Sequence, residues 1–295
     1  MLLYYGLNQA GRALVAAAAE PDEKWEVSGH GIKCPNLDEV AELGDLVVKD
    51  AGRRNDDRSS FLTLATYAGS PSLPDGSTLR EVWMSLPEGA NSPLSGSRQL
   101  PSVVEISPVG RIPNFPNDEV SGFELYGQFN WLNADKGLSF DERAALLNRT
   151  FPTLHNSFTP RPMSLSGDLF QLMLDVPTPK GWLLVDLRNK PALPAWLLMT
   201  FGHIIYGDRK YRRTYATPTL GKNTKPLDPI ISWWAVLFAL SMLARYRPSA
   251  WSAMLDVDRS SDATAIEHLM RRAHKVCANI IVWHLQEFDL NAHGP

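Results

Sequence analysis

The longest uncharged apolar segment of the chain runs from Ile230 to Ala244 and predicts a buried helix. It reads IISWWAVLFALSMLA and contains no charged residue and no proline. A segment of this length is too short for a membrane span, which needs about 20 apolar residues, and it suits a core helix enclosed on most sides. Arg245 and Arg247 follow in its last turn, where cations complement the helix dipole. Pro248 ends the helix, because the residue before a proline avoids the helical region.

Helices are also predicted at both ends of the chain. Residues 2–19 form an amphipathic pattern in which Tyr4, Asn8 and Arg12 recur about one turn apart and share roughly one face. If Arg12 is half-buried on that face, it needs an anion or a carbonyl as partner. A last helix is predicted from about residue 262 to residue 287. No capping residue precedes the first helix, so we expect a further segment ahead of it.

Between these helices the pattern changes to short β-rich runs separated by proline, glycine and serine, which predicts strands. The predicted strands are residues 61–67, 80–86, 102–106, 122–130, 170–176 and 182–187. A short polar helix is predicted before them, at residues 37–47. Another interrupts them, because Ser139 followed by early acidic residues is a typical helix start, and it runs to about Arg149.

This order of elements predicts an α+β fold in which the N- and C-terminal helices pack together beside a strand-rich middle region. It does not fit a parallel sheet with alternating helices. We therefore expect residues 1–58 and 191–295 to build one helical domain, and residues 59–190 to form the strand-rich region as an insertion or second layer.

Composition narrows the functional class only a little. The 295 residues carry a formal net charge of -3, so the whole molecule has no electrostatic pull toward nucleic acid. The two cysteines, Cys34 and Cys277, are too few for a zinc knuckle and indicate a reducing compartment. The first helix lacks the basic start of a signal peptide. We therefore expect a cytoplasmic protein without a transmembrane segment, and the sequence leaves self-association open.

Motifs for cofactor chemistry are missing from the sequence. No glycine-rich phosphate loop follows a strand, and neither HExxH nor GxSxG occurs. The histidines do not cluster at metal-binding spacing, so we predict no metal site, no cofactor and no catalytic residue. Arg149 and His155 are spaced as in the helical HEPN ribonucleases, but Pro152 breaks the helix that would align them.

His30 is the best single candidate for a binding residue. It lies between Gly29 and Gly31, and flanking glycines let another group approach the backbone closely. A histidine that caps a helix or bonds a backbone carbonyl explains the same pattern equally well. The candidate residues for ligand or partner binding are Tyr5, Asn8, Arg12, His30, Arg245, Tyr246 and Arg247.

A second candidate surface is the basic loop around residues 209–215, which interleaves cations with aromatic residues. Such a composition suits phosphate contacts with base stacking, and it is equally typical of a solvated loop. Its candidate nucleic-acid-binding residues are Arg209, Lys210, Arg212 and Arg213.

Two segments together resemble the YaaC-like family of bacterial proteins. The first is LLYYGLNQAGRAL at residues 2–14, followed by the turn at residues 30–32. The second is LSMLARY at residues 240–246, with Pro248 and Trp251 after it. The resemblance implies a bacterial protein with no accepted catalytic mechanism to carry over. Some relatives look like components of anti-phage defence systems that act beside a partner protein.

Our leading functional hypothesis is therefore a non-enzymatic recognition or sensor component of an anti-phage defence system, acting with a protein partner from the same operon. The alternatives are a metal-independent HEPN-like ribonuclease and a nucleic-acid-binding protein. In the ribonuclease, Arg245 or Arg149 would stabilise the phosphorane, and His30 or His155 would act as acid or base.

Overall fold

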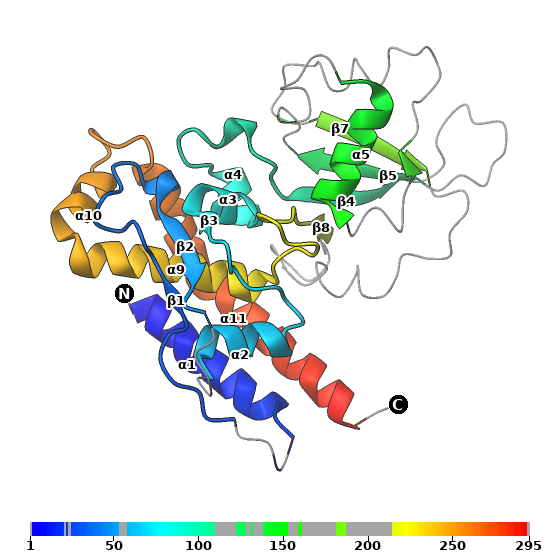
Figure 1. The fold of residues 1–295 in the computed structure, drawn as a ribbon. Helices are drawn as coiled ribbons and strands as arrows, with labels where there is room; N and C mark the ends of the chain where they lie inside the picture. Colours follow the sequence, from blue (N-terminus) through cyan, green and yellow to red (C-terminus); the bar gives the residue numbers. More distant parts are fainter. Residues whose placement is uncertain are drawn as a thin grey trace. The chain divides into compact units, whose positions relative to one another are not determined.

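The computed structural model describes residues 2–20, 22, 25–52, 58–109, 122–127, 131, 138–152, 159–160, 181–186 and 214–293. They divide into two units (Figure 1). Unit 1 combines the two ends of the chain, residues 1–97 and 220–295, and unit 2 is formed by residues 98–219. Residues 59–97, which we expected in the strand-rich region, thus lie in the unit that holds both chain ends.

Three long helices from the two chain ends pack against one another in unit 1. They are α1 (Leu2–Ala18), α9 (Pro229–Tyr246) and α11 (Ala263–His293), and α10 (Pro248–Leu255) adjoins both α9 and α11 (Figure 1). The predicted α+β class and the packing of the terminal helices are confirmed. The predicted first, apolar and last helices correspond to α1, α9 and α11.

α9 is the core helix of unit 1. Asp228 caps its start by accepting a hydrogen bond from the backbone N–H of Ile230 at 2.8 Å, and every residue from Pro229 to Ser241 is buried. Among the described residues α9 is the one helix long and apolar enough to cross a membrane, but 83% of that window is buried inside the protein. The core helix of a soluble protein passes the same test of length and composition. Burial, more than length, therefore identifies α9 as a core element.

Close contact between α1 and α9 depends on a glycine. The buried stripe of α1 consists of Tyr4, Leu7, Asn8, Gly11, Leu14 and Val15. A Cβ atom added at Gly11 would overlap the ring of Trp234 on α9 and touch Leu64. Glycine lets the two helix backbones approach here, and this explains why a residue of low helix propensity lies inside α1.

The segment that we predicted as a strand at residues 61–67 is a helix, α2 (Ser60–Tyr67). Its β-rich composition was misleading. Phe61, Leu64 and Ala65 are buried at helical spacing, and α2 packs against α1 and α9. Contacts with other helices therefore outweigh the local strand preference of the sequence.

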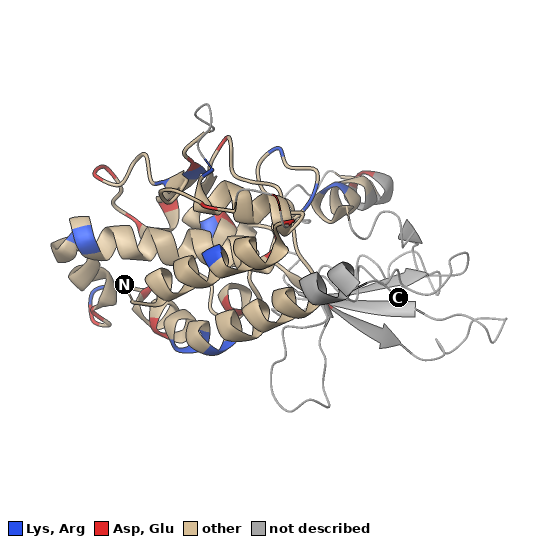
Figure 2. Cartoon of the chain, turned by 90° about the horizontal axis from the view of Figure 1, so that it is seen from below, with Lys and Arg blue, Asp and Glu red and all other residues tan. Residues whose placement is uncertain are grey.

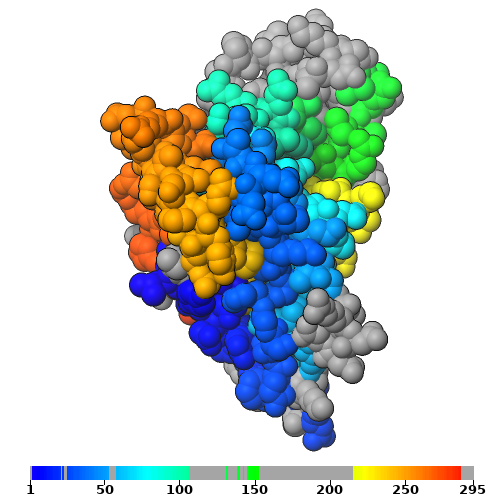
Figure 3. All heavy atoms as spheres, turned by 60° about the vertical axis from the view of Figure 1, so that its left-hand side comes forward, coloured from blue at the N-terminus to red at the C-terminus, as the bar shows by residue number. Residues whose placement is uncertain are grey.

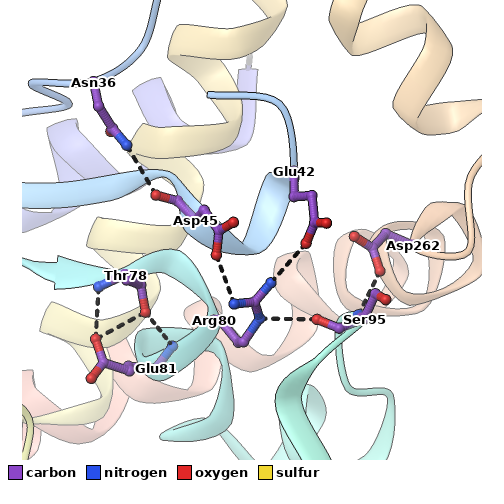
Figure 4. Close-up of polar contacts among 8 residues, drawn as sticks. All are labelled: Asn36, Glu42, Asp45, Thr78, Arg80, Glu81, Ser95 and Asp262. Atoms are coloured by element: carbon purple, nitrogen blue, oxygen red, sulfur yellow. Dashed lines mark hydrogen bonds and ion pairs between the residues drawn. The ribbon is translucent and has the colours of Figure 1, made fainter. Parts of the chain in front are cut away.

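The predicted strand at residues 80–86 is also wrong, because these residues begin in helix α3 (Leu79–Met84). Thr78 and Glu81 form a capping box at its start: Glu81 Oε2 accepts from the Thr78 backbone N–H at 2.8 Å, and Thr78 Oγ1 accepts from the Glu81 N–H at 3.3 Å (Figure 4). This start signal is visible in the sequence and was missed. The short helix α4 (Pro87–Asn91) follows directly.

Arg80 on α3 joins separate segments of unit 1 (Figure 4). Its guanidinium donates to Asp45 Oδ1 at 2.7 Å and to Glu42 Oε2 at 3.2 Å, and its Nε donates to the Ser95 carbonyl at 2.9 Å. The Ser95 N–H in turn donates to Asp262 Oδ1 at 2.7 Å, just ahead of α11. Arg80 is thus a structural arginine whose charge is met by carboxylates.

A small antiparallel sheet in unit 1 carries the chain between α1 and α3. Its strands are β1 (Ile32–Lys33), β2 (Val47–Asp50) and β3 (Ser77–Thr78), in the order β1-β2-β3. β1 also contacts α9. The sheet therefore holds the segment around His30 beside the core helix.

The predicted polar helix at residues 37–47 is wrong. This segment forms turns, a short 3-10 helix at Leu43–Asp45 and then β2. The Asn36 side chain satisfies backbone groups of this segment in place of helical hydrogen bonds. It donates to the Asp45 carbonyl at 3.0 Å and accepts from the Val47 N–H at 2.8 Å. An asparagine that satisfies the backbone in this way favours a turn over a helix.

Unit 2 contains a five-stranded antiparallel sheet. Its strands are β4 (Val104–Val109), β5 (Gly122–Gly127), β6 (Thr159–Pro160), β7 (Gly181–Asp186) and β8 (Thr214–Ala216), in the order β6-β7-β5-β4-β8. The predicted strands at residues 102–106, 122–130 and 182–187 are confirmed as β4, β5 and β7. The prediction at residues 170–176 lies outside the described residues.

Helix α5 (Phe140–Thr150) accompanies this sheet in unit 2 and confirms the predicted helix from Ser139. A capping box starts it, with Glu142 Oε2 accepting from the Ser139 backbone N–H at 2.8 Å. At its other end Thr150 accepts at its carbonyl from the Thr219 N–H at 2.9 Å.

Candidate functional site

The N-terminal end of α1, the turn at His30 and the C-terminal end of α9 carry most of the candidate binding residues. Figure 3 shows the N-terminal segment in blue directly against the C-terminal segment in orange. We use the name "the corner" for Tyr5, His30, Arg245 and Tyr246. All four belong to unit 1.

The turn at His30 is held by the start of α2. Gly29 and Gly31 have positive φ angles of 58° and 71°, and a Cβ atom on Gly31 would overlap the Ser59 side chain. Ser60 Oγ donates to the Gly29 carbonyl at 3.0 Å, and the Phe61 N–H donates to the His30 carbonyl at 3.2 Å. The two glycines thus permit a tight turn that α2 fixes in position.

The His30 ring is oriented by two side chains from α1. Nδ1 lies 2.8 Å from the Tyr4 hydroxyl and 3.4 Å from Asn8 Nδ2, and Asn8 Nδ2 also donates to the Tyr4 hydroxyl at 3.5 Å. The ring also lies among aromatic neighbours, 5.6 Å from the Tyr4 ring and 6.1 Å from the Phe238 ring. Tyr4 is 1% exposed and Asn8 is buried, so both supports are rigid parts of the core.

These contacts favour one tautomer of the His30 ring. Burial raises the pKa of Tyr4 to about 12, so its hydroxyl keeps its proton at neutral pH and can donate to Nδ1. Burial, assisted by the positive charge of Arg245, lowers the pKa of His30, so the ring is neutral near pH 7. With Nδ1 as acceptor, Nε2 carries the hydrogen and is left as a donor.

Arg245 lies exposed at the last turn of α9. Its Nη1 donates to the Tyr5 hydroxyl at 2.6 Å, and its guanidinium lies over the ring of Tyr246, 5.2 Å from the centroid. The rings of Tyr5 and Tyr246 are themselves exposed, at 39% and 58%. No carboxylate pairs with Arg245 among the residues that the structure describes.

The chain belongs to the YaaC-like family. A family model described as YaaC-like protein matches residues 1–285, which include unit 2, most of unit 1 and every residue of the corner. No curated protein and no solved structure matches the chain. The match confirms the resemblance that we identified from residues 2–14 and 240–246.

The candidate binding residues Arg247 and Arg12 of this YaaC-like chain do not belong to the corner. Arg247 donates to the carbonyls of Leu37 and Asp38, at 2.9 and 2.6 Å, so it fastens the loop after β1 to the end of α9. Arg12 is exposed, so the condition under which it would need an anion or a carbonyl as partner does not apply. Each four-residue step adds about 40° of rotation, which carries Arg12 out of the buried stripe.

The candidate nucleic-acid-binding residues Arg209, Lys210, Arg212 and Arg213 lie outside the described residues, as does His155. Arg149 is exposed at the C-terminal end of α5 in unit 2. Within the described ranges no group of three or more metal-ligating side chains comes together.

Tyr4 is the residue of this site that our candidate set omitted. Its hydroxyl orients His30, and its ring lies 5.5 Å from Phe238 and 6.2 Å from Trp234 on α9. The spacing of Tyr4 and Asn8 by one helical turn was the available signal. The partner, His30, is 26 residues away from Tyr4 in the chain, and a contact at that separation cannot be read from local spacing.

Proposed function

We propose that this YaaC-like chain is a recognition or sensor protein of a bacterial anti-phage defence system, which acts in the cytoplasm with a protein partner and has no enzymatic activity of its own. The recognition function rests on the surroundings of Arg245. Its exposed guanidinium has a phenol hydroxyl and an aromatic ring as its partners within the described residues.

Comparison with Arg80 explains why this arrangement favours binding. Arg80 is 17% exposed and pairs with two carboxylates and a carbonyl, as a structural arginine does. Arg245 lies exposed beside exposed aromatic rings, with donors left over. Arginine combined with tyrosine is the composition enriched where proteins bind partners and ligands.

The corner supports binding better than catalysis. Metal-independent cleavage of a phosphodiester needs a general acid and a general base that both reach the reacting atoms. His30 is the one titratable imidazole of the corner, and its Nδ1 is already occupied by the Tyr4 hydroxyl. One neutral donor and one guanidinium suit recognition of a ligand.

The defence setting and the partner from the same operon are supported by the family resemblance. The defence function is tested by phage plating on a host strain that lacks the gene. The strain is complemented with the wild-type chain, with Arg245→Ala or with Arg271→Ala. Arg271 is a matched control, because it is an exposed arginine of unit 1 that pairs with Glu267 one turn away. We expect phage plating to be reduced by the wild type and by Arg271→Ala, and to be restored by Arg245→Ala.

Affinity capture of the tagged chain during infection, with protein and nucleic acid identified together, tests the partner. We expect one protein from the same operon to be recovered with the wild type and with both variants. Equal phage plating with and without the gene, in a host that expresses the full operon, would remove the defence function.

A metal-independent ribonuclease or nucleic-acid-binding protein is the second candidate. The observation that favours it is the charge of Arg245, which acts on His30, since an imidazole beside a guanidinium suits a phosphodiester. Incubation of labelled RNA with the purified chain and a chelator tests for metal-independent ribonuclease activity. Cleavage that is lost in His30→Ala would establish the ribonuclease in place of the recognition protein.

A further inference from the structure

The corner offers hydrogen-bond donors and hardly any acceptor. Arg245 has further N–H groups beyond the one that binds Tyr5. The Tyr5 hydroxyl accepts that bond, so its own hydrogen is free to donate. His30 adds the Nε2 hydrogen, because Nδ1 is occupied by Tyr4. A site that presents mainly donors, one of them cationic, selects an anionic group with several acceptor oxygens.

Anionic groups of the chain itself do not fill this site in the described residues. Within the described residues of unit 1, Arg80, Lys222, Arg259 and Arg271 pair with carboxylates, and Arg245 does not. Acidic and basic residues are mixed along unit 1 in Figure 2 and the whole chain has a net charge of -3, so we assign recognition of the anion to these particular donors. Such local recognition fits a small ligand better than a long polyanion.

The donors are also held in place before any ligand binds. Tyr4 and Asn8 fix the His30 ring from inside the core. The Tyr246 ring lies against the Arg245 guanidinium and limits where it can point. Preorganised donors lose little entropy when a ligand binds, which raises the affinity that they provide.

Flat aromatic surface lies directly beside the donors. Tyr246 is 58% exposed and Tyr5 is 39% exposed, although both rings are large enough to be buried at a benefit. Exposed rings beside an arginine are the combination on which nucleobases stack. Tyr246 is the more exposed of the two and is the stronger stacking surface.

From these observations we propose that the corner binds a mononucleotide, with its phosphate on Arg245, the Tyr5 hydroxyl and His30 Nε2–H, and its base against the Tyr246 ring. The assignment rests on the proposed recognition function and names the class of ligand that triggers it. A phosphate suits the corner better than a carboxylate, because its tetrahedral oxygens can accept from donors on separate elements, while a carboxylate is planar.

Calorimetric titration of the full-length chain at low ionic strength tests the assignment. The probes are adenosine 5′-monophosphate, ribose 5-phosphate, inorganic phosphate and adenosine. We expect the mononucleotide to bind about tenfold more tightly than ribose 5-phosphate, through stacking of the base, and adenosine not to bind. Inorganic phosphate should bind at least as weakly as ribose 5-phosphate.

Variants assign the contacts. Arg245→Ala should weaken each phosphate probe at least about tenfold, as loss of a charge-assisted hydrogen bond does. Tyr246→Leu should abolish the preference for the mononucleotide over ribose 5-phosphate, and it should weaken ribose 5-phosphate only slightly, through the lost contact with Arg245. Tyr5→Phe removes only a hydroxyl and should also weaken phosphate binding. It serves as the test if Arg245→Ala fails to fold. Arg271→Ala should bind like the wild type.

Three results would overturn the assignment: no saturable binding of any phosphate probe, equal affinity of wild type and Arg245→Ala, or adenosine binding as tightly as its monophosphate. Equal affinities for the mononucleotide and ribose 5-phosphate would exclude a nucleotide. Because phage plating and partner capture are measured separately, Arg245-dependent defence without phosphate binding would reject this ligand and leave the recognition function intact.

Discussion

At the scale of single residues, the influence of Arg245 on His30 is directly measurable. The pKa of His30 is lowered from 6.5 by burial first and by the charge of Arg245 second. In Arg245→Ala we expect the pKa to rise but to stay below 6.5, because the burial remains. Titration of the histidine ring signals by NMR measures both values. Arg271→Ala is the control and should leave the titration of His30 unchanged.

Equal titration curves for the wild type and Arg245→Ala would mean that the guanidinium points away from the histidine in solution. The mononucleotide assignment would then lose its shared site for Arg245 and His30. The Tyr4 contact would be unaffected, because it is a separate hydrogen bond at Nδ1.

A second residue-scale prediction concerns Glu88, which is 1% exposed in α4. Burial raises the pKa of its carboxyl from 4.5 to about 7, an effect only partly offset by its own backbone N–H and by Arg272. The folded state thus binds the proton more tightly than the unfolded state. Its contribution to stability is complete below about pH 4.5 and is lost as the pH rises through 7.

Glu88→Gln removes this titration. We expect its free energy of unfolding to exceed that of the wild type increasingly between pH 5 and pH 8, by on the order of 2–3 kcal/mol at the upper end. Urea unfolding at several pH values, followed by circular dichroism, measures the difference. Glu267→Gln, on the exposed side of α11, should show no such trend. A pH-independent difference for Glu88→Gln would contradict the raised pKa.

At the scale of elements, two glycines of α1 have opposite roles. A Cβ atom on Gly6 would have nothing within 4 Å, whereas one on Gly11 would overlap Trp234. Gly6→Ala should therefore raise the free energy of unfolding by about 0.5–1 kcal/mol through helix propensity. Gly11→Ala should lower it by about 1–3 kcal/mol, because overpacking forces α1 away from α9. Thermal and urea unfolding of the two variants test this, and equal signs would contradict it.

The elements also differ in how far their sequences predicted them. α1, α9 and α11 were predicted correctly because an apolar stripe or an apolar run spans each helix. α2 and α3 were mistaken for strands, since a segment of six to eight residues shows too few helical turns for its period to be distinct. Packing of Phe61 and Leu64 against neighbouring helices decides α2, and no local pattern reports it.

The residues of the candidate site also differ in how far the sequence predicted them. His30 was selected because glycines flank it, and Arg245 because it ends the apolar helix, so both were visible in the sequence. The hydrogen bond from Arg245 to Tyr5 joins residues separated by 240 positions, and the Tyr4 ring packs against Trp234 of α9. Long-range contacts of this kind arise from the packing of α1 on α9, which only the fold determines.

At the scale of the whole molecule, charge tests the nucleic-acid alternative. The formal net charge is -3, and acidic and basic residues are mixed along unit 1 (Figure 2). Binding of a polyanion without base specificity needs several phosphate contacts and weakens steeply with salt. We therefore expect no saturable binding of single-stranded RNA or DNA at physiological salt, measured by fluorescence anisotropy.

The salt dependence separates the corner from the basic segment at residues 209–213. A mononucleotide held at one phosphate should lose little affinity between low and physiological salt, whereas a strand held by several cations should lose it by orders of magnitude. Tight binding of a nucleic-acid strand with a steep salt dependence, unchanged in Arg245→Ala and abolished by replacing Arg212 and Arg213, would make the basic segment the binding surface. It would contradict the expectation drawn from the charge of the whole chain.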